Sequence, residues 1–203
     1  MAKKCVFAGS FDPPTLGHKA VMEDCLKMFD EVVVAVLINP AKTPFFTVEQ
    51  RLEMLRLTVE GIFQNTDGAG YGCGFGACAQ AGADKNAHTT TAGAQAGGSL
   101  IERAGARVKI VAFEGTVAEL LEKEGTKVYV RGVRNTVDFE YENANFFASK
   151  KLDSQLTAVY LPCRQELLHV SSGMVRNSLA FGTPIDEYVT KEVQSYIFGA
   201  CGK

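Results

Sequence analysis

The 203-residue chain lacks a long apolar run, an excess of charge of one sign and an abundance of histidine. No hydrophobic stretch approaches the length of about 20 residues that a membrane-spanning helix needs, and the apolar run after Lys3 and Lys4 is too short for a secretory signal. The formal net charge of −2 gives no overall attraction to nucleic acid or to an anionic membrane, so phosphate binding would need a local group of basic residues. We therefore expect a cytoplasmic protein with small-molecule ligands, and neither nucleic acid nor membrane as a partner.

Cysteine and histidine follow no pattern of disulfides or of a metal site. The six cysteines show no tight repeated spacing, and Cys5 and Cys25 lie in segments expected to be buried, as is typical of free thiols in a reducing compartment. Cys73, Cys78 and His88 match no zinc-binding spacing, so we assign no metal ligand. With three histidines in the chain, no Ser-His-Asp or metal-hydrolase constellation is visible.

Composition and periodicity predict a single α/β domain over residues 1–203. Hydrophobic residues make up 46% of the chain and charged residues 22%, which is typical of one globular unit with a sizeable core. Short β-branched runs alternate with helical patterns, which predicts a doubly wound, Rossmann-like parallel sheet of about five strands. The predicted strands cover residues 6–8, 32–37, 108–113, 127–130 and 157–161. Sheets of this kind bind ligands at the carboxyl ends of their strands.

Capping residues mark the expected helices. Thr47 to Gln50 has the sequence of a capping box and precedes an apolar stripe, which predicts a helix from Thr47 to about Glu60. Further helices are expected over residues 114–124, 171–182 and 189–197, after a first helix that begins near residue 17.

One segment departs from this alternation. Residues 61–98 hold ten of the 20 glycines, together with Ala, Thr, Gln and Asn and almost no large aliphatic residue. Such a composition cannot build a core, so we expect a flexible insertion over about 61–104.

The most informative stretch runs from Ala8 to His18 and joins a short apolar strand to a helix. Gly9 lets the backbone approach a ligand closely, and Pro13 and Pro14 delay the helix until the residues before His18. Free N–H groups and the positive end of the helix dipole meet at this point, which favours an anion. The side-chain donors of the stretch are Ser10, Thr15 and His18.

Three further groups of residues stand where a phosphate site could use them. Lys42 follows the second expected strand, and Ser171 and Ser172 begin another helix. Arg131 and Arg134 follow the strand at 127–130, where Gly132 is expected to allow a turn. Taken singly, each has a structural alternative: a solvated loop lysine, arginines on a rim and a serine helix cap.

The run from Gly9 to His18, Gly-Ser-Phe-Asp-Pro-Pro-Thr-Leu-Gly-His, resembles the signature of the nucleotidylyltransferase superfamily. Together with Lys42, with Arg131-Gly132-Val133-Arg134 and with the acidic run from Asp138 to Glu142, it makes the chain resemble the phosphopantetheine adenylyltransferase family. The resemblance covers residues 3–60 and about 108–197. The chain departs from the family pattern at Ser10, Leu167 and Gly173, where threonine, an aromatic and a third hydroxyl residue are usual. The insertion over residues 61–98 also has no counterpart in the pattern.

The resemblance implies transfer of AMP from ATP to 4′-phosphopantetheine, which gives dephospho-coenzyme A and pyrophosphate, with Mg²⁺ as cofactor and a cytoplasmic homohexamer as the assembly. It implies catalytic roles for His18, which would stabilise the transition state, and for Lys42 and Arg131. The residues implied to bind ATP are Ser10, Phe11, His18, Gly132, Val133, Arg134, Glu142, Leu167, Leu168, His169, Val170, Ser171, Ser172 and Gly173. Those implied to bind phosphopantetheine are Ser10, Lys42, Val117 and Arg131.

Two alternatives stay open at this point. A related nucleotidylyltransferase with another phosphate acceptor would share the first motif, although the run from Arg131 to Glu142 argues against it. A non-catalytic nucleotide-binding module would fit if Gly173 and the insertion had removed activity.

Overall fold

A computed structural model describes residues 3–41, 43–64, 99–100 and 107–199 of the chain. None of the helices among these residues is long and apolar enough to cross a membrane. Cys5, Cys25 and Cys163, the cysteines in the described part, are free thiols, as predicted for the first two. Cys73, Cys78 and His88 lie outside it, and so does most of the expected insertion.

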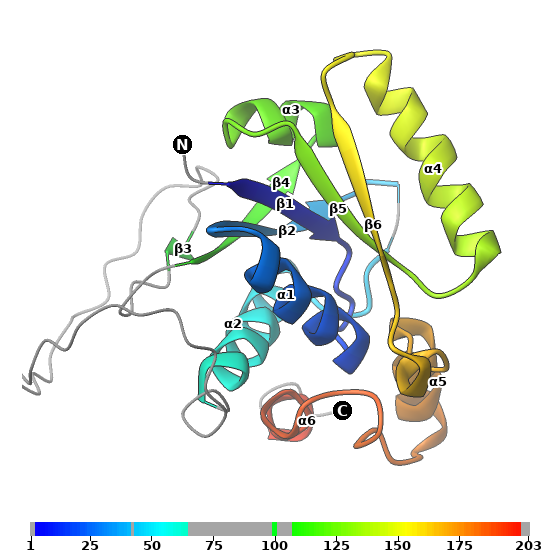
Figure 1. Cartoon of the computed structure of the whole chain (residues 1–203). Helices are drawn as coiled ribbons and strands as arrows, with labels where there is room; N and C mark the ends of the chain where they lie inside the picture. The colour runs from blue at the N-terminus through cyan, green and yellow to red at the C-terminus, as the bar shows by residue number, and fades with distance from the viewer. Residues whose placement is uncertain (1–2, 42, 65–98, 101–106, 200–203) are drawn as a thin grey trace, which may run out of the picture.

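The described strands form one six-stranded sheet in the order β3-β4-β2-β1-β5-β6 (Figure 1). The strands are β1 (Lys4–Gly9), β2 (Glu31–Ile38), β3 (Ser99–Leu100), β4 (Val108–Glu114), β5 (Val128–Val133) and β6 (Thr157–Pro162). Neighbours among β4, β2, β1, β5 and β6 pair in parallel, and β3 pairs antiparallel with β4. The five-stranded parallel sheet predicted from the sequence is thus confirmed, with one short antiparallel strand added.

The chain reverses its direction of sheet growth beside β1. It builds outward through β2 and β4, returns across the sheet, and then adds β5 and β6 on the other side of β1. A crevice forms at the carboxyl ends of two strands where such a reversal occurs, and here those strands are β1 and β5.

Helices cover both faces of the sheet (Figure 1). The described helices are α1 (Leu16–Met28), α2 (Val48–Gln64), α3 (Val117–Lys123), α4 (Thr136–Lys150), α5 (Ser172–Phe181) and α6 (Lys191–Gly199). Side chains alternate along a strand, so Cys5 and Phe7 of β1 pack in a core with α1 and α2, whereas Val6 and Ala8 pack in a second core with α3 and α4. A third core joins α2, α5 and α6 around Phe46.

Two boundaries predicted for the insertion are wrong. The helix expected to end near Glu60 continues to Gln64. Ile62 is buried in the core under α2, and its burial stabilises another helical turn beyond Gly61. At the other side, Ser99 and Leu100 form β3 instead of belonging to a loop. The composition averaged over residues 61–98 is poor in large aliphatic residues, and this average conceals the apolar Ile62 at the start of the segment.

The strand expected over residues 127–130 is also too short, since β5 continues through Arg131 and Gly132 to Val133. Gly132 serves the packing of α1 on this strand and does not form a turn. A Cβ at that position would lie 2.7 Å from Cγ2 of Val21, which is closer than real side chains approach.

Candidate functional site

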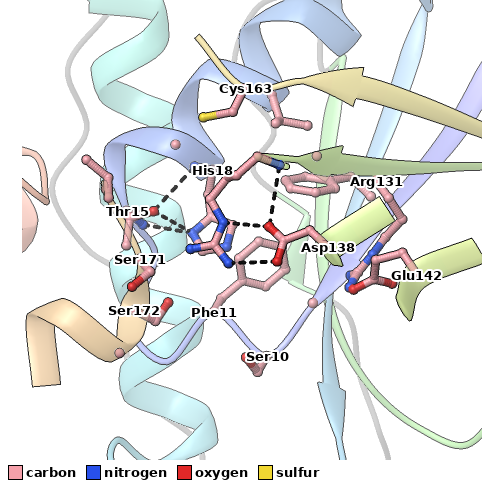
Figure 2. A pocket seen from close by; sticks show the side chains of 18 of the residues that line it. Ser10, Phe11, Thr15, His18, Arg131, Asp138, Glu142, Cys163, Ser171 and Ser172 are labelled. Carbon is pink, nitrogen blue, oxygen red and sulfur yellow. Dashed lines mark hydrogen bonds and ion pairs between the residues drawn. The ribbon is translucent and has the colours of Figure 1, made fainter. Parts of the chain in front are cut away.

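A pocket of about 340 Å³ lies at the carboxyl ends of β1 and β5 (Figure 2). It is bounded by the loop after β1, the first turn of α1, the end of β5, the start of α4 and the start of α5. The residues that line it are Phe7, Ala8, Gly9, Ser10, Phe11, Thr15, Gly17, His18, Val21, Arg131, Gly132, Arg134, Asp138, Glu142, Cys163, Val170, Ser171, Ser172, Gly173 and Arg176.

The loop after β1 is built around the ring of Phe11. This residue is fully buried and has a φ of 46°, a conformation that non-glycine residues adopt rarely. Its ring lies edge-on to those of Phe7, at 5.4 Å between centroids, and His18, at 5.0 Å. A Cβ on Gly9 would lie 3.4 Å from the same ring, at the close limit of ordinary contact. Ser10 is left exposed at the mouth of the pocket.

Thr15 and His18 form a reciprocal cap at the start of α1. The Thr15 hydroxyl accepts from the backbone N–H of His18 at 3.5 Å, and Nδ1 of His18 accepts from the backbone N–H of Thr15 at 3.0 Å. The Thr15 hydroxyl also lies 2.9 Å from Nδ1 (Figure 2). An Nδ1 that accepts from a backbone N–H carries no proton, so in the neutral ring the proton lies on Nε2.

The surroundings of His18 keep its ring neutral. Burial, followed by the positive charges of Arg131 and Arg134, lowers the pKa of His18 from 6.5 to about 4. At neutral pH the ring is therefore a hydrogen-bond donor through Nε2 and not a cation.

Arg131 reaches back from β5 to the end of β1. One terminal nitrogen donates to the carbonyl oxygen of Ala8 at 2.6 Å, and the other forms an ion pair with Glu142 of α4. Its Nε is buried and has no hydrogen-bond partner among the described residues. A buried donor of this kind favours an added acceptor such as a phosphate oxygen.

Arg134 forms a two-point ion pair with Asp138, which lies one turn before Glu142 on α4. The distances from Nε and Nη2 of Arg134 to the two carboxylate oxygens are 2.7 and 3.1 Å. The hydrogen bond from Arg134 lowers the pKa of Asp138 below its ordinary value. Arg131 and Arg134 are thus each held by one carboxylate of α4.

The start of α5 forms the wall opposite α4. The Ser171 hydroxyl caps the helix by accepting from the N–H of Met174 at 3.2 Å, and the Ser172 hydroxyl donates to the carbonyl oxygen of Pro13 at 2.7 Å. The N-termini of α1 and α5 therefore open into the same pocket, which favours an anion there.

The pocket brings together most of the site residues predicted from the sequence, and their roles toward ligands stay predictions. Those that line it are Ser10, Phe11, His18, Arg131, Gly132, Arg134, Glu142, Val170, Ser171, Ser172 and Gly173. Among the described residues, Val117, Val133, Leu167, Leu168 and His169 do not line it. Val117 instead packs on the core under α3 and α4. Lys42 lies outside the described residues.

Two residues with polar side chains, Arg176 and Cys163, line the pocket although the sequence analysis gave them no role. Arg176 projects from α5 and donates to the carbonyl oxygen of Asp12, and Cys163 follows the end of β6. The spacing of Arg176, one helical turn after Ser172, was the available signal for it. Cys163 shared the strand-end position that singled out Arg131.

Comparisons with known proteins identify the family of the chain. The model of the cytidylyltransferase-like family matches residues 6–69. The phosphopantetheine adenylyltransferase of Symbiobacterium thermophilum is 34% identical over 186 residues, which cover 92% of this chain and 88% of that protein. The one from Thermotoga neapolitana is 32% identical over 193 residues, with 95% and 93% covered.

Similarity in structure extends to more distant proteins. A crystal structure described as a candidate nicotinate-nucleotide adenylyltransferase from Vibrio parahaemolyticus superposes with a TM-score of 0.58 at 20% identity, and covers 98% of this chain and 93% of that one. This likeness concerns the fold alone. Identity above 30% over nearly the whole length decides the family, and the chain belongs to the phosphopantetheine adenylyltransferases.

Proposed function

We propose that the protein transfers the adenylyl group of ATP to 4′-phosphopantetheine and releases dephospho-coenzyme A and pyrophosphate. The observation that carries the proposal is the neutral His18, which presents an Nε2 proton in a pocket with two helix N-termini and three arginines. Family membership supplies the identity of the two substrates.

The chemistry asks for positioning more than for proton transfer. An oxygen of the acceptor phosphate forms a bond to the α-phosphorus of ATP while the bond from that phosphorus to the bridging oxygen of pyrophosphate breaks. A phosphate nucleophile is already ionised at neutral pH, so no general base is required. His18 donates from Nε2 to the oxygen of the α-phosphate, where charge grows in the transition state.

Arg131 and Lys42 are proposed to hold the acceptor phosphate. For Arg131 the support is geometric, because its buried Nε lacks a partner among the described residues and the guanidinium lies at the carboxyl end of β5. For Lys42 the support is its place in the sequence after β2. Arg134 and the N–H groups at the start of α5 are proposed to bind the phosphates of ATP.

Mg²⁺ is proposed as the cofactor, bound chiefly through the phosphates of ATP. The described residues contain no cluster of three or more His, Cys, Asp or Glu side chains that could hold a metal ion. In the pocket itself, Asp138 and Glu142 are engaged by arginines. Mg²⁺ often keeps several of its waters and binds largely through substrate phosphates, so it does not need a cage of protein ligands. When bound, the ion would neutralise charge on the phosphates.

A homohexamer in the cytoplasm is proposed as the working assembly. Support for self-association comes from α4. Among the residues of this helix, all of which the structure describes, only Phe146 is buried. Its Val137 is 73% exposed, Tyr141 64% and Phe147 56%, and exposed apolar side chains gathered on one helix favour an interface there. Light scattering coupled to gel filtration tests the proposal, since a monomer at micromolar concentration would contradict it.

Pyrophosphate release with three acceptors tests the function. We expect release with ATP and phosphopantetheine, and little with nicotinamide mononucleotide or glycerol phosphate. Preference for either of the last two would indicate a related transferase. ATP binding without release in the presence of any acceptor would indicate a non-catalytic nucleotide-binding module.

A further inference from the structure

Asp12 is a buried charge that does not line the pocket. It belongs to the loop after β1, and 8% of its surface is exposed. Its two carboxylate oxygens accept from the backbone N–H groups of Phe45 and Phe46, at 2.8 and 2.9 Å. The carboxylate therefore ties the first loop of the site to the segment between β2 and α2.

Arg51 makes the same connection in the opposite direction. This arginine of α2 is 4% exposed, and its Nη1 donates to the carbonyl oxygen of Ser10 at 3.0 Å. Its Nε donates to the carbonyl oxygen of Thr47 at 3.3 Å. Asp12 and Arg51 thus both connect the loop after β1 to the segment between β2 and α2, and we call this pair of residues the clamp.

The clamp fixes the far end of the segment that contains Lys42. The near end is fixed by β2, which ends at Ile38. At the far end Phe46 is 1% exposed and packs in the core around α2, α5 and α6, next to the N–H groups that Asp12 holds. Lys42 lies between these two anchors in the sequence, three residues before Phe45.

Asp12 also contacts a residue that lines the pocket. Arg176, which lines the pocket, donates to the carbonyl oxygen of Asp12, and its Nη1 lies 3.9 Å from a carboxylate oxygen. One residue along the chain, Pro13 accepts from the Ser172 hydroxyl. The same loop is therefore held by the wall of the pocket and by the segment of Lys42.

We propose that Asp12 is a positioning residue. By fixing Phe45 and Phe46, it fixes the segment that contains Lys42 relative to the pocket, so that the acceptor phosphate lies in line with the α-phosphate of ATP. The inference rests on the proposed function, in which Lys42 binds the acceptor phosphate. Asp12 acts through the backbone of Phe45 and Phe46 and touches neither substrate.

A double-mutant cycle of Asp12→Asn with Lys42→Ala tests the inference. Asparagine keeps the shape of Asp12 and one acceptor oxygen, but its NH₂ group opposes one of the two N–H groups. We expect Asp12→Asn to raise the KM for phosphopantetheine by about 10-fold, as expected for the loss of one charge-assisted hydrogen bond to phosphate, and to change the KM for ATP by less than about 3-fold. In the Lys42→Ala background the same substitution should raise the KM by no more than about 2-fold further.

Fully multiplicative effects of the two substitutions, an equal rise of both KM values in Asp12→Asn, or a normal KM in Lys42→Ala would each overturn the inference. Absence of turnover with phosphopantetheine in the unmodified enzyme would contradict the proposed function instead. If Asp12→Asn does not fold, Arg51→Lys replaces it in the cycle, because lysine keeps the charge and cannot make both of the arginine's hydrogen bonds. The same selective rise in the KM for phosphopantetheine is expected, and a normal value would overturn the inference.

Discussion

Replacing His18 separates its two tasks, the cap of α1 and the donor in the pocket. In His18→Ala both the Nδ1 acceptor and the Nε2 donor disappear. Asparagine places its side-chain oxygen near the position of Nδ1, where it accepts from the Thr15 N–H, but has no atom at the position of Nε2. The two variants therefore differ in the cap and agree in the missing donor.

The expected sizes follow from these contacts. Loss of one preorganised transition-state donor typically lowers kcat by about 10²–10³-fold, or about 2.7–4 kcal/mol, and both variants should show it. Loss of the capping acceptor costs about 1 kcal/mol of stability. A chain of this size loses about 2–4 °C in Tm for each kcal/mol, so a lower Tm is expected for His18→Ala, with a smaller decrease for His18→Asn.

Steady-state kinetics and thermal unfolding measure the two effects. ATP binding by calorimetry should weaken far less than kcat falls, because the donor acts chiefly on charge that develops in the transition state. His88→Ala is the control, since no role toward either substrate is predicted for this histidine. Near-normal turnover in His18→Asn would show that His18 has a structural role alone, and would refute the reasoning.

Three further predictions concern pH, packing and the insertion. Because the pKa of His18 is about 4 when folded and 6.5 when unfolded, stability should be constant above pH 6.5 and fall by about 3 kcal/mol toward pH 4 on this account, and urea titrations should show the fall reduced in His18→Asn. Gly132→Ala should lose about 1–3 kcal/mol to the contact with Val21, whereas Gly199→Ala, with no described atom within 4 Å of its Cβ, should lose little. Replacing residues 65–98 by a short polar turn should preserve activity and Tm, because that composition offers little to bury; loss of folding would contradict this.

The sequence predicted the fold well where a residue pattern is typical of a single kind of element. Alternation of β-branched strands with helices gave the parallel sheet, and Thr47 with Gln50 marked the start of α2 to within a residue. Glycine misled in both directions, because it has several uses. Gly132 lies inside β5 to admit Val21, and Gly61 lies inside α2 because Ile62 reaches the core.

The candidate site was predictable at the level of which residues share the pocket, and not at the level of which groups pair. Strand ends and helix starts pointed to His18, Arg131 and the serines of α5. The pairing of Arg131 with Glu142, and the backbone contacts of Asp12, depend on segments 11 and more than 30 residues apart, and no local pattern encodes them.

Transfer of labelled phosphorus from ATP to the acceptor tests the central claim most directly. With phosphopantetheine and ATP labelled at the α-phosphate, the label should appear in dephospho-coenzyme A in equal amount to the pyrophosphate released. With ATP labelled at the γ-phosphate, it should appear in pyrophosphate alone. Label from the γ-phosphate in the acceptor, or label from the α-phosphate in free AMP without a coenzyme A precursor, would contradict the proposed function.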